Sequence, residues 1–147
     1  MPKDERIVKT LSHFSFGENG IPMEILMGCG CGEEYSVEIE QENIIIRAEA
    51  AQGVFYALQT LRQLFTEEKI PCCYIEDKPD FKHRGFYHDA TRGRVPKVEA
   101  VKKLIDDMAY YKLNSLQLYV EHTFEFKEFE DSIERTGYLS ADELKEI

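Results

Sequence analysis

The stretch that decides the fold is 84-RGFYHDATRGRVP-96, together with 97-KVEAVKKLIDDMAYYK-112 and 115-SLQLYV-120 that follow it. The first and last of these segments contain short apolar runs typical of strands. The middle segment places five apolar residues on one face of a helix: Val98, Val101, Leu104, Ile105 and Met108. A strand, a helix and a strand joined by short loops predict a βαβ unit with parallel strands and a right-handed crossover.

One βαβ unit leaves a sheet unfinished, because parallel strands need neighbours on both sides. The segment 139-LSADELKEI-147 begins a further helix, with Ser140 and Glu143 spaced as a capping box. The 67 residues from 81 to 147 are far fewer than the roughly 200 that a (β/α)8 barrel needs. We therefore expect residues 80–147 to be the first β-α-β steps of a truncated barrel.

Residues 1–79 have a different pattern, and Pro79 in 77-DKPDF-81 marks the predicted boundary. We expect strands at 6–16, 21–28 and 70–77, and a hairpin within 35–50 that turns at Gln41-Glu42. The stretch 52–68 predicts a helix whose apolar stripe is formed by Val54, Leu58, Leu61 and Phe65, widened by Phe55 and Leu64. These elements predict an α+β domain in which one helix covers an antiparallel sheet.

Composition limits the functions open to the chain. Its 147 residues are 43% hydrophobic and 12% aromatic, which is enough for a packed core. The net charge of −10 repels phosphate, so nucleic acid and anionic membrane are excluded as partners. We see neither a signal peptide at the N-terminus nor an apolar window long enough to span a membrane. The expected location is therefore cytoplasmic or unassigned.

The four cysteines occur as Cys29-Gly-Cys31 and Cys72-Cys73. Neither pair has the Cys-x2-4-Cys spacing of a structural zinc site. We expect buried, reduced thiols that pack as small hydrophobes. No metal or cofactor is predicted.

Several of these segments occur in an order that resembles glycoside hydrolase family 20. Its pattern has a G-x5-Q-T-L-x-Q-L helix, here 53-GVFYALQTLRQL-64, before I-x-D-x-P-x-F-x-x-R-G-x-x-x-D-x-[ST]-R, here 75-IEDKPDFKHRGFYHDATR-92. A K-x-N, here 112-KLN-114, opens the next barrel strand. The resemblance covers about residues 37 to 147. Any single motif is weak, but the ordered set is specific.

The resemblance implies a β-N-acetylhexosaminidase, in which an α+β domain precedes a (β/α)8 barrel. Such enzymes release terminal GlcNAc or GalNAc with retention, because the acetamido oxygen of the sugar attacks the anomeric carbon. An adjacent Asp-Glu pair, in a Gly-Asp-Glu context, orients the acetamide and protonates the leaving oxygen. Here Glu33-Glu34 fall in a turn and Asp142-Glu143 in a helix cap. No catalytic residue is therefore assigned, and we expect the chain to be inactive alone.

One functional residue carries over from the resemblance. Arg92 matches the arginine that binds sugar hydroxyls in the terminal-sugar pocket of the family, and a guanidinium suits two vicinal hydroxyls. The alternative is a surface arginine paired with Asp89 or another carboxylate. Arg84 and Asp89 are expected to be structural. Where many members have a histidine-rich strand that ends in Asp-Asp, this chain has 117-QLYVEHTFEF-126, so Glu121 or His122 could fill that polar position.

Two further hypotheses stay open. The chain could be a self-standing, non-catalytic carbohydrate-binding module, or a module that forms homo-oligomers through its exposed strand edges. A cysteine-based zinc module is the least favoured of the readings.

Overall fold

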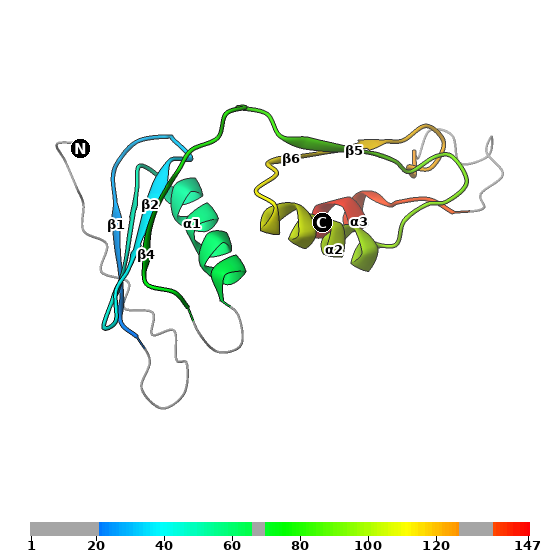
Figure 1. The fold of residues 1–147 in the computed structure, drawn as a ribbon. Helices are drawn as coiled ribbons and strands as arrows, with labels where there is room; N and C mark the ends of the chain where they lie inside the picture. Colours follow the sequence, from blue (N-terminus) through cyan, green and yellow to red (C-terminus); the bar gives the residue numbers. More distant parts are fainter. Residues whose placement is uncertain (1–20, 66–69, 127–136) are drawn as a thin grey trace. The chain divides into compact units, whose positions relative to one another are not determined.

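The computed structural model describes residues 21–65, 70–126 and 137–147. The chain divides into two compact units, 1–82 and 83–147 (Figure 1). The division falls three residues after the predicted boundary at Pro79. The expected strand at 6–16 and the end of the expected helix at 52–68 lie outside the described residues.

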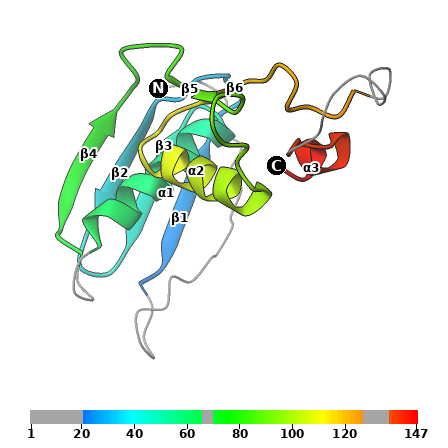
Figure 2. The same ribbon diagram turned by 90° about the vertical axis from the view of Figure 1, so that its right-hand side faces the viewer.

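The first unit is a four-stranded sheet with one helix. Its elements are β1 (Met23–Met27), β2 (Tyr35–Ile39), β3 (Ile44–Ala48), α1 (Ala51–Leu64) and β4 (Cys73–Asp77). The strand order is β1-β3-β2-β4, and α1 lies along one face of the sheet (Figure 2). The hairpin between β2 and β3 is confirmed, and the Glu40 amide donates to the Asn43 carbonyl across its turn at 2.9 Å.

The sheet is mixed, so the expectation of an antiparallel sheet was wrong for one pair. Strand β2 runs antiparallel to β3 and β4, but β1 runs parallel to β3. The glycine-rich loop after β1 passes the end of β3, where the amides of Gly28 and Gly30 donate to the carbonyls of Ala48 and Glu49 at 2.9 Å each. The loop leaves a gap between β1 and β2, which run in opposite directions, and β3 fills that gap. Because β3 is antiparallel to β2, it runs parallel to β1.

The core of the first unit lies between the sheet and α1. Its buried residues are Met23, Tyr35, Val37, Ile39, Ile44, Ile46, Tyr56, Ala57 and Leu61. The buried face of α1 differs from the predicted apolar stripe. Phe55 was expected on the stripe but is 45% exposed, whereas Tyr56 and Ala57 were not expected there and are buried. Gly53 explains the difference. A Cβ there would lie 2.5 Å from the Glu34 carbonyl oxygen, so the helix approaches the sheet through its smallest side chains.

Two residues of the sequence motifs take part in hydrogen bonds that connect α1, β2 and β4. The Tyr35 hydroxyl lies 2.6 Å from the Thr60 hydroxyl of α1 and donates to the Asp77 carboxylate at 2.7 Å. The bridge joins the first strand of the hairpin to the helix and to the last strand. Thr60 of the Gln-Thr-Leu motif and Asp77 of the Ile-x-Asp motif are therefore structural.

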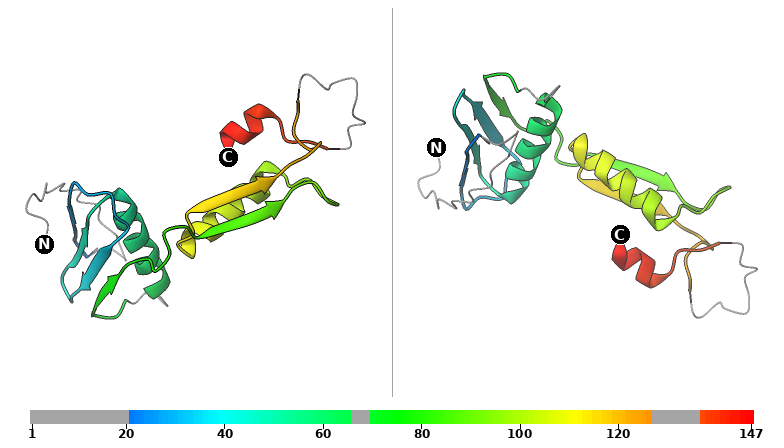
Figure 3. Two further views of the ribbon diagram at one scale, coloured as in Figure 1. Left: turned by 90° about the horizontal axis from the view of Figure 1, so that it is seen from above. Right: turned by 90° about the horizontal axis from the view of Figure 1, so that it is seen from below.

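The second unit is the predicted βαβ unit. Its elements are β5 (Gly85–Asp89), α2 (Val98–Tyr110), β6 (Ser115–Tyr119) and α3 (Ala141–Glu146). Strands β5 and β6 pair in parallel, and α2 lies against one face of the pair (Figure 3). Val98, Val101 and Met108 of the predicted helix face are buried. The capping box that opens α3 is confirmed by both of its Ser140–Glu143 bonds, at 2.7 and 3.2 Å. That this unit begins a barrel stays a prediction.

Arg84, just before β5, links this strand to the segment that precedes β6. Its amide donates to the Asn114 side chain at 2.9 Å, and the Asn114 amide donates back to the Arg84 carbonyl at 2.8 Å. Its guanidinium Nε donates to the carbonyl of Lys112, a residue with φ of 59°, at 2.8 Å. The Lys-x-Asn motif is thus the joint between α2 and β6, and the structural role predicted for Arg84 is confirmed.

The expectation of buried cysteines was wrong. Cys29, Cys31 and Cys72 are exposed, Cys73 is half-buried, and all four are free thiols. The physical reason is their position: Cys29 and Cys31 lie in the loop after β1, and Cys72 lies just before β4. Within the described ranges, no helix is both long and apolar enough to cross a membrane.

Candidate functional site

The carboxyl ends of β5 and β6 bring together five polar or aromatic residues, which we call the strand-end site. Two parallel strands in register place Asp89 opposite Tyr119. The chain then leaves each strand at the same edge of the pair, so residues that follow β5 meet residues that follow β6. The members of the strand-end site are Asp89, Thr91, Arg92, Tyr119 and Glu121.

Asp89 shapes the loop that leaves β5. One of its carboxylate oxygens accepts the amide protons of Thr91 at 2.9 Å and Arg92 at 3.1 Å. These two bonds favour the charged carboxylate, and with the charges of Arg92 and His88 they hold the pKa of Asp89 below its ordinary value despite some desolvation. Asp89 is therefore an anion that fixes the loop, as its predicted structural role requires.

Arg92 lies above the end of the strand pair. Its guanidinium forms an ion pair with Asp89 at 3.3 Å, and its Cζ atom lies 5.3 Å from the centre of the Tyr119 ring. The side chain is 73% exposed. The pairing with Asp89 that was the alternative for Arg92 is thus present. It does not use up the donors, because a guanidinium carries five N–H groups. A sugar-binding role for Arg92 stays a prediction.

Thr91 joins the two strand ends. Its hydroxyl donates to the Tyr119 carbonyl at 3.2 Å and accepts the Glu121 amide proton at 3.1 Å. The Tyr119 hydroxyl donates to the Glu121 carboxylate, and this bond, with desolvation and the charge of Glu121, raises the pKa of Tyr119. Glu121 therefore belongs to the strand-end site. His122, the other residue predicted for this position, is exposed.

Sequence reasoning named Arg92 as a site residue, gave Asp89 a structural role and left Glu121 and His122 as alternatives, but it missed Thr91 and Tyr119. The register of a parallel pair could have found Tyr119, because it is the last residue of its strand as Asp89 is of β5. The other carboxylate pairs lie elsewhere: Glu143 caps α3, and Glu34 precedes β2.

Metal binding has no candidate in the part of the chain that the structure describes. No group of three or more histidine, cysteine, aspartate or glutamate side chains converges there. The strand-end site instead presents a guanidinium, two carboxylates and an aromatic ring at one edge of the strand pair. Such a combination can orient a polar ligand.

Two family models match the chain in succession. The model of glycosyl hydrolase family 20, domain 2, matches residues 31–78. The model of the glycosyl hydrolase family 20 catalytic domain matches residues 81–131. The first match covers most of the described sheet and helix, and the second contains the strand-end site.

Named relatives agree with the models. A β-hexosaminidase of Akkermansia muciniphila is 30% identical over 138 residues, which cover 78% of this chain and 28% of the relative. The β-N-acetylhexosaminidase of Bacteroides fragilis is a structural neighbour with a TM-score of 0.73 and 29% identity, over 84% of this chain and 29% of the neighbour. A mutant β-hexosaminidase of Streptomyces plicatus, in complex with the product GlcNAc, has a TM-score of 0.73 and 25% identity over 88% of this chain and 31% of its own. The chain thus spans less than a third of the length of these three relatives.

Proposed function

The chain belongs to glycosyl hydrolase family 20, and we propose that it forms part of a glycosidase that removes terminal N-acetylhexosamine, GlcNAc or GalNAc, from glycoconjugates. The observation that carries the proposal is the succession of the two family matches, with the strand-end site inside the second. The relative from Streptomyces plicatus, whose structure holds GlcNAc, supports the same class of ligand.

In this proposal Arg92 binds the terminal sugar. Asp89 draws the guanidinium to one side through the ion pair, and the Tyr119 ring lies beneath it. The remaining N–H groups of a planar guanidinium can donate in parallel to two vicinal hydroxyls of a pyranose. The position of Arg92, after the carboxyl end of a parallel strand, is where (β/α)8 barrels bind their ligands.

Hydrolysis in this proposal follows the substrate-assisted retaining route, in which the acetamido oxygen is the nucleophile. The route needs an adjacent Asp-Glu pair to orient the acetamide and to protonate the leaving oxygen. The sequence contains no Gly-Asp-Glu. We therefore assign to this chain a share of the sugar pocket and no catalytic residue, and we expect it to be inactive alone.

Two assays test the proposal. The chain by itself should release no aryl group from an aryl N-acetyl-β-glucosaminide beyond a heat-treated control, and turnover would refute its inactivity. A chimera of the Bacteroides fragilis enzyme, with its aligned segment replaced by residues 31–131 of this chain, should hydrolyse the same substrate. A chimera that is folded by circular dichroism but does not hydrolyse it would contradict the assignment.

The homo-oligomer alternative has one observation in its favour. Among the described strands, β5 and β6 pair only with each other, so each has an edge without a described partner. Exposed edges of this kind can pair with a second copy. Light scattering of the chain distinguishes a dimer from the monomer.

A further inference from the structure

The sheet of the first unit has a second face, which we call the outer face, turned away from α1. Side chains alternate along a strand, and Val37 and Ile46 point into the core against α1. Their neighbours along the strands therefore point outward and form two rows across the sheet. The register gives the first row as Leu26, Arg47, Ser36 and Glu76. The second row is Glu24, Ile45, Glu38 and Tyr74.

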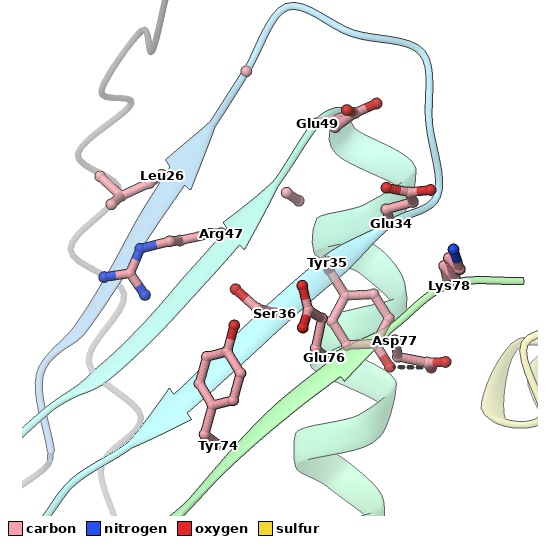
Figure 4. Close-up of a pocket in the computed structure, with 12 residues that line it drawn as sticks. Leu26, Glu34, Tyr35, Ser36, Arg47, Glu49, Tyr74, Glu76, Asp77 and Lys78 are labelled. Carbon is pink, nitrogen blue, oxygen red and sulfur yellow. Dashed lines mark hydrogen bonds between the residues drawn. The ribbon is translucent and has the colours of Figure 1, made fainter. Parts of the chain in front are cut away.

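A hollow of about 720 Å³ lies over the first row (Figure 4). Ser36 has the shortest side chain of that row and stands between Arg47 and Glu76, so the surface dips at its position. Gly28 and Ala48 add little side-chain volume along the rim. The volume falls within the roughly 300–1,000 Å³ typical of sites that hold small molecules.

The hollow has an aromatic side. Tyr74 is 60% exposed, although a large apolar ring gains free energy from burial. In Figure 4 its hydroxyl points toward the part of the sheet that bears Ser36 and Glu76. An exposed tyrosine ring offers a flat apolar surface with a polar tip, which fits a ligand with one apolar face and a polar rim.

The hollow also presents both donors and acceptors. The Arg47 guanidinium is held by Glu38 at 2.9 Å, which fixes its direction while other N–H groups remain to donate. Ser36 can donate and accept, and the Glu76 carboxylate accepts. A pyranose ring needs this mixture, because each of its hydroxyls both donates and accepts.

The charge around the hollow selects among ligands. Three acidic residues line it on the outer side, Glu34, Glu49 and Glu76, whereas the Asp77 carboxylate is bonded to Tyr35 on the core side. Two basic residues, Arg47 and Lys78, also line it, so these five side chains have a net charge of −1. Sulfated or carboxylated sugars are therefore repelled, and uncharged sugars are not.

We propose that the outer face binds a saccharide without acidic groups, with one pyranose ring against Tyr74 and its hydroxyls bound by Ser36, Arg47 and Glu76. This site lies in the first unit and is built from other residues than the strand-end site. It does not depend on the proposed hydrolase function.

The test is an NMR titration of the isotopically labelled chain with two uncharged probes, cellotriose and N,N′,N″-triacetylchitotriose, up to about 20 mM, because one ring on an open surface binds weakly. We expect saturable shifts of the Ser36, Arg47 and Glu76 amides with both probes. A sulfated trisaccharide should shift them at least tenfold more weakly. Tyr74→Ala and Ser36→Gln should each weaken binding at least tenfold, because they remove the ring and fill the hollow. Tyr111→Ala, which removes a 71% exposed tyrosine of the second unit, should change nothing.

Four outcomes would overturn the proposal. They are the absence of shifts in the first unit, shifts that survive Tyr74→Ala, and equal binding of the sulfated probe. The fourth uses tetralysine as an added cationic probe, because the lining is acidic: stronger shifts of the same amides with tetralysine than with either sugar would show a site for cations. If the first outcome occurs with shifts confined to residues 89–121, those shifts would support the sugar-binding role of the strand-end site. The two proposals therefore fail separately.

Discussion

Replacing Tyr35 by phenylalanine should destabilise the first unit by about 2 kcal/mol. The substitution keeps the ring in the core and removes only the hydroxyl that bridges Thr60 at 2.6 Å and Asp77 at 2.7 Å. The bond between two neutral hydroxyls is worth about 1 kcal/mol. The bond to the carboxylate is worth about 1.5–3 kcal/mol, and water replaces part of it because Asp77 is only half-buried.

The assay is a urea titration followed by NMR at amides of β2 and β3, which report on the first unit alone. With a slope of about 1–3 kcal/mol per molar urea, the midpoint should fall by roughly 1 M. Thr60→Val removes only one of the two bonds and should cost about half as much. Tyr74→Phe is the matched control, because that hydroxyl lies on an exposed ring, and it should stay within about 0.5 kcal/mol. A Tyr35→Phe variant as stable as the control would refute the bridge.

Three other predictions follow from single contacts. Because the pKa of Asp89 lies below its ordinary value of 3.8, its loop-fixing bonds should persist above that pH and be lost only as the pH falls through the lower folded value; the Thr91 amide shift in an NMR titration measures this, and Asp89→Asn should abolish the transition. The Tyr119 phenol should titrate above 10.0, and Glu121→Gln should lower that value, as NMR of ring-labelled tyrosine would show; an unchanged value would contradict the Tyr119–Glu121 bond. Gly53→Ala should destabilise the first unit by at least about 1 kcal/mol in the urea assay, because its Cβ would lie 2.5 Å from a carbonyl oxygen of the sheet; an equal or higher midpoint would contradict the close approach.

Local patterns predicted most of the elements. The alternation in 35–48 gave the hairpin, the helical spacing in 97–112 gave α2, and Ser140 with Glu143 gave the cap of α3. Each of these depends on residues close together in the sequence. The mixed sheet was not predicted, because the direction of β1 relative to β3 depends on the loop after β1. That loop contacts the end of β3, which comes later in the sequence.

Tertiary contacts explain the other errors. The face of α1 is set by the approach at Gly53, and apolar spacing alone does not reveal that approach. The cysteines are exposed because of where the loops run, although their residue type favours burial. At the strand-end site, Arg92 was found through its motif, whereas Tyr119 required the register of β6 against β5. The hollow on the outer face likewise depends on strand order, which the sequence pattern did not predict.

The most direct test of the central claim is the effect of Arg92→Lys on the chimeric enzyme. Lysine keeps the charge but loses the planar pair of donors, so kcat/KM for the aryl N-acetyl-β-glucosaminide should fall about 10- to 150-fold, the equivalent of one or two charge-assisted hydrogen bonds. Arg94→Lys, an exposed arginine in the same loop, is the matched control and should leave kcat/KM within about twofold. Equal kcat/KM values for the Arg92→Lys and Arg94→Lys chimeras would contradict the assignment of Arg92 to the sugar pocket.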